Sequence, residues 1–276
     1  MKIDNLADDT HYTLADLRYL MSRLRDSETG CPWDIKQNFK SIISCTLEEV
    51  YEVVDAIETE DPEQLKEELG DLLFQIIFYS QLGQEQNLFD FDDIISLITT
   101  KLLRRHPHVF PLGTLTSVRD TKEAVNADTI NQSWEAIKQQ ERTKKGASQI
   151  FDDIPLALPA LTRAVKLQKR ASTVGFDWPS IVLVVAKINE EIEELNTEMA
   201  EGDEDSIVEE LGDIMFSCVN LARHLKRDPE TVMRHANRKF QRRFQTMQSF
   251  LGDQDFDQLS DHQMESLWTQ VKQAEQ

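Results

Sequence analysis

The sequence predicts an all-α protein made of two tandem helical domains that arose by internal duplication. Three observations support this fold class. Glycine and proline are scarce, at nine and eight of 276 residues, in a chain rich in helix-forming Glu, Leu, Lys and Gln. Apolar residues recur at helical spacing, and alternating strand patterns are hard to find. A long internal repeat indicates duplication.

The repeat aligns residues 48–74 with residues 190–216 at a constant offset of 142. Ten of these 27 positions are identical without a gap, where chance in a Glu-rich chain gives roughly two or three. The match continues from 101–105 to 239–243, and from 133–141 to 267–275. The offset falls by four at each step, as expected if loops between matching helices were shortened.

Each copy therefore has the same predicted order of elements. A lead helix is followed by a Glu-rich helix, a second acidic helix, a basic helix and a final Trp-containing helix. Apolar residues spaced along one helical face predict the first lead helix at 14–24. Asp61-Pro62 separates the two acidic helices of the first copy, with proline at the first helical position. Gly202-Asp203 has the same role in the second copy.

The boundary between the copies is predicted between Arg142 and Pro159, where 144–148 has the composition of a linker. We therefore expect an N-terminal domain at 1–142, a linker at 143–158 and a C-terminal domain at 159–276. Segments 71–79 and 213–221 are apolar almost all round, which predicts central helices. We expect two copies of the chain to associate through them as a homodimer.

Charge and composition exclude several classes of partner. Fifty acidic against thirty basic residues give a net charge of −20, which argues against binding a nucleic acid polymer or an anionic membrane. No apolar run approaches the length of a membrane span, and the N-terminus lacks a signal-peptide core. The three cysteines are far apart, which predicts free thiols rather than disulfides. We expect a cytoplasmic protein.

Paired carboxylates are the main chemical signal. Glu191 and Glu194 are three residues apart, as are Glu210 and Asp213, so each pair shares a helix face. If the two helices pack antiparallel, the four carboxylates converge, and a hard cation such as Mg²⁺ or Mn²⁺ relieves their repulsion. Solvated faces are the usual explanation of such spacing. A metal site is favoured over solvated faces because the first copy repeats the pattern as Glu49, Glu52, Glu68 and Asp71.

A basic cluster follows in the second copy. Lys239, Arg242 and Arg243 fall within five residues, and clustered guanidinium groups suit a phosphate chain. The alternative is a basic helix paired with acidic faces. Trp268 could stack on a base or fill the core, and its residue type alone favours the core.

The combined pattern resembles a known family. Glu-Glu-x-x-Glu is followed sixteen residues later by Glu-x-x-Asp, twice, with Cys-Pro-Trp-Asp at 31–34 and Lys-Phe-x-Arg-Arg-Phe at 239–244. This closely resembles MazG, the tandem-domain nucleoside triphosphate pyrophosphohydrolases of bacteria. The resemblance covers nearly the whole chain. It implies two MazG-like helical bundles, a dimer, and Mg²⁺-dependent hydrolysis of nucleoside triphosphates, ATP among them, to monophosphate and pyrophosphate.

The resemblance also implies roles for individual residues. The family's metal-binding positions carry over onto Glu191, Glu194, Glu210 and Asp213, and in the first copy onto Glu49, Glu52, Glu68 and Asp71. Its nucleotide contacts carry over onto Lys187, Glu190, Lys239, Arg242, Arg243 and Trp268. Glu190 is also our candidate for orienting or deprotonating the attacking water.

Other phosphohydrolase classes lack support. The chain has no GxxxxGK[ST] loop and no adjacent His-Asp pair. Segment 67–70 mimics the end of a Nudix box without the residues that precede it. The rival from another class is a non-catalytic nucleotide- or metal-binding regulator that acts through a protein partner.

We expect the second copy to carry most of the activity. Lys187 is one turn before Glu191, where its ammonium could reach a phosphate, and the matching residue of the first copy is Cys45. In the first copy His106-Pro107 replaces the aromatic end of the basic cluster, which should end that helix early.

Overall fold

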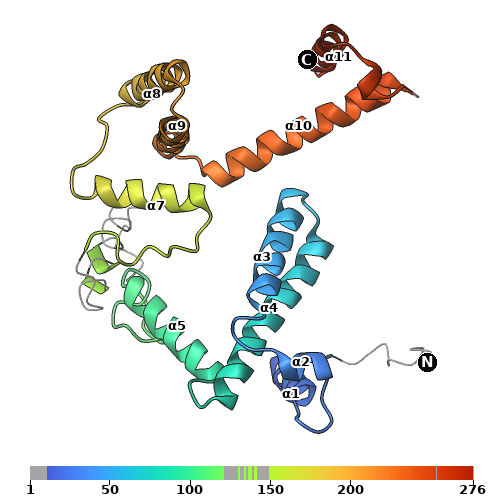
Figure 1. Ribbon diagram of the computed structural model, residues 1–276. Coiled ribbons are helices and arrows are strands. Elements are labelled where there is room, and N and C mark those ends of the chain that lie inside the picture. Colours follow the sequence, from blue (N-terminus) through green and yellow to red (C-terminus); the bar gives the residue numbers. More distant parts are fainter. Residues whose placement is uncertain are drawn as a thin grey trace. The chain divides into compact units, whose positions relative to one another are not determined.

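The computed structural model describes residues 11–120, 130, 134, 136–138, 140–141, 149–252 and 254–275 (Figure 1). These residues form helices and include no strand, which confirms the all-α class. The chain divides into two compact units, 1–137 and 138–276. Part of the predicted linker, 143–148, and its boundary residue 142 lie outside the described residues. Among the described helices none is both long and apolar enough to cross a membrane.

The first unit has the first four helices of the predicted order and one short additional helix at 32–36, while the predicted Trp-containing helix at 133–141 lies partly outside the described residues. The helix bounds are α1 (Leu14–Leu24), α2 (Pro32–Lys36), α3 (Ile43–Glu58), α4 (Pro62–Glu85) and α5 (Phe91–Arg105). Thr13 and Asp16 form a capping box that starts α1. The Asp61 side chain caps α4, with Pro62 at its first position, as predicted for this turn.

The first unit has a closed apolar core. The α3–α4 hairpin packs along its length, and α1 packs against α4. The core residues are Met21, Ile42, Ile77, Phe78, Leu82 and Phe91. Gly83 lets the chain after α4 return closely, because a Cβ there would lie 2.7 Å from the Phe89 ring. This core fills the space between the lead helix and the second acidic helix.

The basic helix of the first unit ends early, as predicted. It stops at Arg105, with His106 at the C-cap and Pro107 following, after 15 residues. The matching helix of the second unit runs for 23 residues, from Pro229 to Leu251. The two units therefore differ in how far their basic helices extend.

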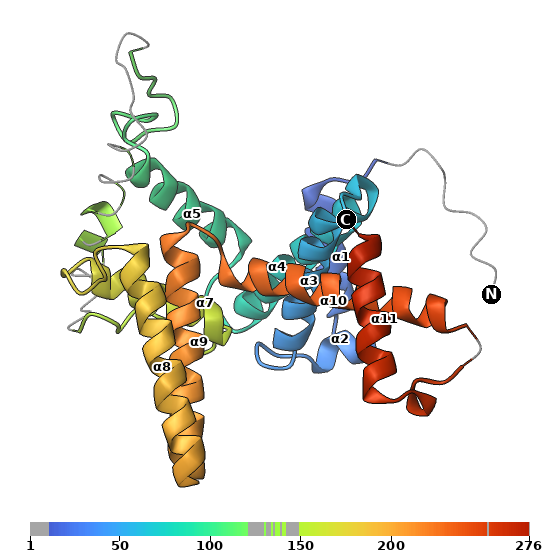
Figure 2. The same cartoon turned by 90° about the horizontal axis from the view of Figure 1, so that it is seen from above.

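The second unit contains a long helical hairpin. Its elements are α7 (Ala160–Ser172), α8 (Ile181–Glu201), α9 (Glu204–His224), α10 (Pro229–Leu251), η1 (Phe256–Gln258) and α11 (Asp261–Ala274). Gly202 ends α8 with a positive φ of 80°, and the Asp203 side chain caps α9. The chain therefore reverses here, and α8 and α9 lie side by side (Figure 2).

The apolar face of α9 differs from the prediction of a central helix. Leu211, Met215 and Phe216 are 49%, 52% and 40% exposed. In α4 the matching Leu69 is also 49% exposed, whereas Phe78, further along that helix, is buried. A two-helix hairpin covers one face of each helix and leaves the others open. Within the described part of a single chain, α9 keeps an uncovered apolar face.

Candidate active site

Three carboxylates of the second unit converge between α8 and α9. Oxygens of Glu191, Glu194 and Glu210 all lie within 4.8 Å of one another. The spacing of three places Glu191 and Glu194 on one face of α8, and the turn at Gly202 brings Glu210 opposite them. The structure thus brings together three of the four predicted metal-ligating residues. We call these three residues the second trio.

The fourth residue of each predicted set lies outside the trio. Asp213 is exposed and one turn beyond Glu210 on α9, and Asp71 is exposed at the matching place on α4. The charge of Asp213 still contributes to raising the pKa of Glu210, so the two carboxylates are close enough to repel. A Cβ on Gly212 would meet nothing within 4 Å. Nothing in the described part of the chain therefore approaches that glycine.

Electrostatics favour a cation at the second trio. A hydrogen bond shared with Glu191, and then burial, raise the pKa of Glu194. Burial, and then the charge of Glu191, raise the pKa of Glu210. Glu210 Oε2 is buried without a hydrogen-bond partner, which is costly for a carboxylate. A divalent cation would relieve both penalties, so the residues present fit one.

Lys187 neutralises part of this charge. Its Nζ lies 2.8 Å from Glu191 Oε1 and 2.9 Å from Glu190 Oε1. The hydrogen bond between Lys187 and Glu191 is the main cause of the raised pKa of the lysine and of the lowered pKa of Glu191. Lys187 and Glu190 therefore lie at the edge of the trio and pair with each other there.

The first unit has a matching trio with different neighbours. Oxygens of Glu49, Glu52 and Glu68 lie within 4.8 Å of one another. Burial, and then the charge of Glu68, raise the pKa of Glu52. Gln75 Nε2 donates a hydrogen bond of 3.3 Å to Glu49 Oε1, and half-buried Cys45 stands where the second unit has its lysine. The first trio therefore has no counterpart of the Lys187 ammonium group that pairs with Glu191 in the second trio.

The basic cluster is held by the last helix. Arg242 and Arg243 of α10 both pair with Glu275, at 3.0 Å and 2.8 Å. The hydrogen bond from Arg243 is the main cause of the lowered pKa of Glu275. Lys239 is exposed on the same helix. These ion pairs connect α10 to the segment after α11, rather than to the second trio.

Trp268 of α11 packs beside this cluster. Its ring centroid lies 5.8 Å from that of Phe240, and the Arg243 guanidinium stands 5.8 Å over the indole. Phe244 and Met264 line the same shallow groove. Trp268 is half-buried, so it combines the packing role expected of its residue type with a place next to a predicted phosphate-binding residue.

Comparison with known proteins identifies the family of this chain. The pattern of the MazG nucleotide pyrophosphohydrolase domain matches residues 37–110 and 181–247. The chain is 46% identical over 260 residues to a nucleoside triphosphate pyrophosphohydrolase of Escherichia coli (strain K12), covering 93% of this chain and 95% of that protein. It is 41% identical over 236 residues to the nucleoside triphosphate pyrophosphohydrolase/pyrophosphatase MazG of Thermotoga maritima, covering 86% of each. The chain belongs to the MazG family.

The two MazG segments contain both carboxylate trios, and the second also contains the basic cluster at 239–243. Helix α7 and the loop that joins it to α8 lie outside the matched segments. Side chains from this region and from α9 line a further feature of the second unit. The sequence analysis did not identify it.

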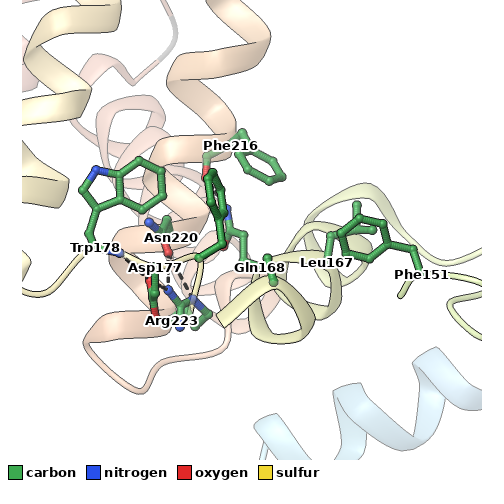
Figure 3. A pocket seen from close by; sticks show the side chains of 10 residues that line it. Phe151, Leu167, Gln168, Asp177, Trp178, Phe216, Asn220 and Arg223 are labelled. Carbon is green, nitrogen blue, oxygen red and sulfur yellow. Dashed lines mark hydrogen bonds and ion pairs between the residues drawn. The ribbon is translucent and has the colours of Figure 1, made fainter. Parts of the chain in front are cut away.

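This feature is a cavity of about 190 Å³ between α7, α9 and the loop before α8. Figure 3 shows aromatic side chains on its walls, including Phe216 of α9 and Trp178 of the loop. Two polar side chains that line it, Gln168 and Asn220, are 7% and 2% exposed. The amide Asn220 within the mostly apolar segment 214–221 was the signal in the sequence that could have revealed it.

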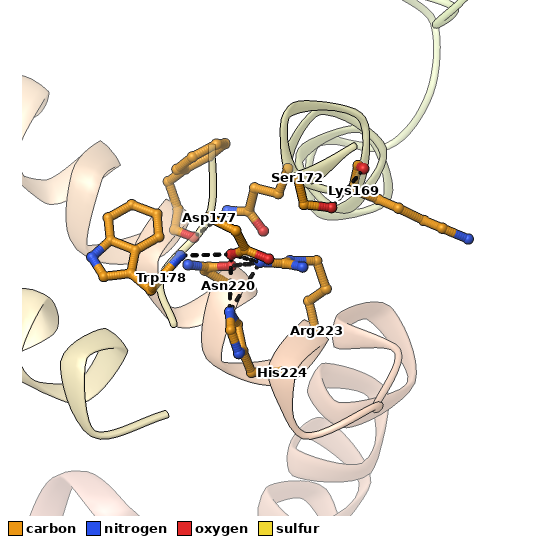
Figure 4. A network of polar contacts seen from close by, with 9 residues as sticks. Lys169, Ser172, Asp177, Trp178, Asn220, Arg223 and His224 are labelled. Carbon is orange, nitrogen blue, oxygen red and sulfur yellow. Dashed lines mark hydrogen bonds and ion pairs between the residues drawn. The ribbon is translucent and has the colours of Figure 1, made fainter. Parts of the chain in front are cut away.

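A polar network fixes one wall of the cavity (Figure 4). Asp177 accepts hydrogen bonds from Arg223 and from His224 Nε2, the latter at 3.1 Å. The bond from Arg223 is the main cause of the lowered pKa of Asp177. Arg223 Nε also donates to Asn220 Oδ1 at 3.0 Å. The loop before α8 is thereby tied to the end of α9.

Proposed function

We propose that this MazG protein hydrolyses nucleoside triphosphates to nucleoside monophosphates and pyrophosphate, mainly in its second unit. The observation that carries the proposal is the convergence of Glu191, Glu194 and Glu210 to within 4.8 Å, in a member of this family. The relatives from E. coli and T. maritima bear the name of this activity. Removal of unwanted nucleotides from the cellular pool is the role that we infer.

Mg²⁺ is the cation that we propose, and Mn²⁺ suits the same oxygen ligands. Glu191, Glu194 and Glu210 would hold it, with Asp213 as the fourth ligand. A bound cation of this kind supplies charge neutralisation for phosphate oxygens and a water of lowered pKa. The unpartnered Glu210 Oε2 supports this assignment.

The protein's own groups have separate proposed roles. Glu190, whose side chain is 57% exposed beside the trio, is proposed to take the proton of the attacking water. Lys187 holds that carboxylate in place through their 2.9 Å ion pair, which makes it a positioning residue as well as a phosphate contact.

The basic cluster is proposed to bind the pyrophosphate that leaves. Lys239, Arg242 and Arg243 would neutralise the negative charge that develops on it. Glu275 keeps the two guanidinium groups together before substrate arrives. Trp268, whose ring lies under Arg243, is proposed as a further nucleotide contact through that arginine.

We also propose that the active form is a homodimer. Val208, Leu211 and Met215 of α9 are 68%, 49% and 52% exposed, and a row of this kind is unfavourable in water. A second copy of the same hairpin can cover it through a twofold axis. Light scattering on the purified chain should give twice 31.9 kDa, and Met215→Lys should shift the protein toward monomer. A monomeric wild type contradicts the dimer.

The bond that breaks is tested with a nucleoside triphosphate labelled at the γ-phosphate. We expect the label to leave as pyrophosphate, with Mg²⁺ present and not with a chelator. Labelled orthophosphate appearing before any pyrophosphate contradicts the assigned bond. The eight ordinary NTPs and dNTPs, with a few oxidised or deaminated ones, form the substrate set.

A non-catalytic regulatory role is the second candidate, and one observation favours it for the first unit. That unit has a carboxylate trio, but Cys45 replaces the lysine and the core is closed by Met21 and Phe78. Metal binding without turnover is the expected behaviour of such a unit.

Free thiols at all three cysteines agree with the cytoplasm as the proposed location of the whole protein.

A further inference from the structure

The cavity of the second unit is too small for a whole nucleotide and large enough for one ring system. Its volume is about 190 Å³. Cavities of about 150 Å³ can admit a benzene-sized molecule, and pockets for whole ligands start at about 300 Å³. The occupant is therefore a planar group that forms part of a larger ligand.

Gln168 gives this cavity a fixed hydrogen-bond acceptor. Its Nε2 donates to the backbone oxygen of Phe216 at 2.9 Å, which sets the orientation of the amide. Its Oε1 is buried without a partner, in a side chain that is 7% exposed. A buried acceptor of this kind is costly unless a ligand donates to it. Figure 3 shows Gln168 among the side chains that line the cavity.

The remaining walls suit the faces of an aromatic ring. Trp178 and Phe176 form an edge-to-face pair with centroids 6.3 Å apart, and Phe216 lies on α9. The charge of Arg223 is already balanced by Asp177, so the cavity does not need an anion. A flat heteroaromatic group with an N–H donor at its edge satisfies all of these features.

The cavity lies on the same side of α9 as Asp213, the proposed fourth ligand next to the second trio. Asp213 and Asn220 are seven residues apart, which places them on one face, two turns or about 10 Å apart. A ribose and the first phosphate separate the base from the middle of a triphosphate by a distance of this order. A nucleotide bound at the carboxylates can therefore reach the cavity with its base.

The first unit closes the equivalent space. Its lead helix reads Leu-Met-Ser-Arg at 20–23, where α7 reads Leu-Gln-Lys-Arg at 167–170. Met21 therefore matches Gln168, and at the repeat offset of 142 Phe78 matches Asn220. Met21 and Phe78 are 0% and 1% exposed in the apolar core. Two buried amides in one copy correspond to two large apolar side chains in the other.

We infer that this cavity binds the nucleobase of the substrate, and that Gln168 determines specificity by accepting a hydrogen bond from an N–H at the edge of the base. Trp178 provides the stacking surface. This inference rests on the proposed hydrolysis of nucleoside triphosphates, and it assigns base recognition to the second unit alone.

The test is Gln168→Met, which introduces the first unit's residue into the second. We expect kcat/KM for base-bearing triphosphates to fall about 5- to 150-fold, mainly through KM. The inhibition constant of inorganic triphosphate, which has no base, should stay within about twofold. Circular dichroism should show a folded protein, because methionine occupies the matching buried position in the first unit.

Trp178→Ala is the second variant, and it lies in a loop rather than in a helix. It should lower kcat/KM for nucleotides about 5- to 150-fold by loss of stacking and leave inhibition by inorganic triphosphate unchanged. Trp178→Phe should largely restore the wild-type value. If Gln168→Met fails to fold, the Trp178 pair decides the question by itself.

Binding of nucleoside monophosphates separates this inference from the proposed activity. Equilibrium dialysis measures their affinity, and tryptophan fluorescence reports contact with Trp178. Trp178→Phe should bind as the wild type does and lose the fluorescence change. A wild type that hydrolyses no triphosphate overturns the proposed function. Unchanged kcat/KM in both variants, or equal losses toward inorganic triphosphate, overturns the base site while hydrolysis stands.

Discussion

Beside the carboxylate trio of the first unit, Gln75 donates a hydrogen bond to Glu49, and the space next to the lead helix is filled by core residues. Beside the trio of the second unit, Lys187 pairs with Glu191 at 2.8 Å. The space next to the lead helix of this unit is a cavity instead of a filled core. The duplicated trios thus have the same geometry in different surroundings. Metal-binding geometry depends on a few spacings within two helices, whereas substrate recognition depends on what packs around them.

The difference also concerns stability. Met21 in the first unit is fully buried among apolar neighbours, which contributes favourable burial energy. Its counterpart Gln168 leaves a buried oxygen unpaired, which costs free energy. Gln75 of the first unit also has a buried oxygen without a partner, so the difference in packing is confined to the lead helices, where Met21 closes the core and Gln168 borders a cavity.

The largest effect should come from removing ligand charges in one unit at a time. Glu194→Gln with Asp213→Asn should lower turnover on the order of 10³-fold, because the shape stays and the cation site is lost. Glu52→Gln with Asp71→Asn should leave most of the turnover. Steady-state pyrophosphate release measures both, and thermal melts check folding. If the first-unit double variant loses turnover and the second-unit double variant keeps it, the first unit is the active one.

Core truncation should distinguish the two lead helices. Met21→Ala should destabilise the first unit by about 2–5 kcal/mol, the usual cost of a cavity in a closed core. Gln168→Ala should change the second unit by about 1 kcal/mol or less, because a hydrogen bond is lost and an unpaired acceptor is removed. Native-state hydrogen exchange of α1 and α7 reports each unit separately. Equal losses in the two helices would contradict the contrast in packing.

A smaller effect is expected from single-charge removal without metal. The raised pKa of Glu194 means that the folded state prefers this carboxyl protonated. Stability is therefore lost as the pH rises from the unfolded pKa, about 4.3, through the higher folded pKa. Glu194→Gln should melt above the wild type at pH 7 with a chelator present, and at the same temperature near pH 3.5.

Adding Mg²⁺ provides the control for that experiment. A cation that binds the folded state raises the melting temperature by mass action. The melting temperature of the wild type should rise in millimolar Mg²⁺, and that of Glu194→Gln should rise less. A variant that melts below the wild type at pH 7 without metal would show that the trio is not under repulsion.

The smallest effect should come from the polar network at the cavity. Arg223 and then His224 lower the pKa of Asp177. Their stabilisation is present in full above the pKa of an unfolded aspartate, about 3.9. It is lost as the pH falls from there through the lower pKa of the folded state. Hydrogen exchange of α9 between pH 5 and 3 should show this loss in the wild type and a flatter profile in Asp177→Asn.

Local sequence alone determined much of this fold. The break at Asp61-Pro62, the turn at Gly202 and the early end of α5 before Pro107 were all predicted correctly. So was the grouping of Glu191 with Glu194, because a spacing of three residues shares a helix face whatever the tertiary context. Each of these features depends on a few neighbouring residues and on helix geometry.

The tertiary structure decided the features that depend on distant contacts. The sequence did not place Asp213 outside the trio, because side-chain rotamers decide whether a carboxylate oxygen reaches those on the facing helix. It also did not reveal the cavity, since Gln168 meets the backbone of Phe216 across 48 positions of sequence. The period of a helix tells which face is apolar. Whether that face closes on a neighbour, as at Met21, or leaves room for a ligand, as at Gln168, depends on how side chains from separate helices fill the space between them.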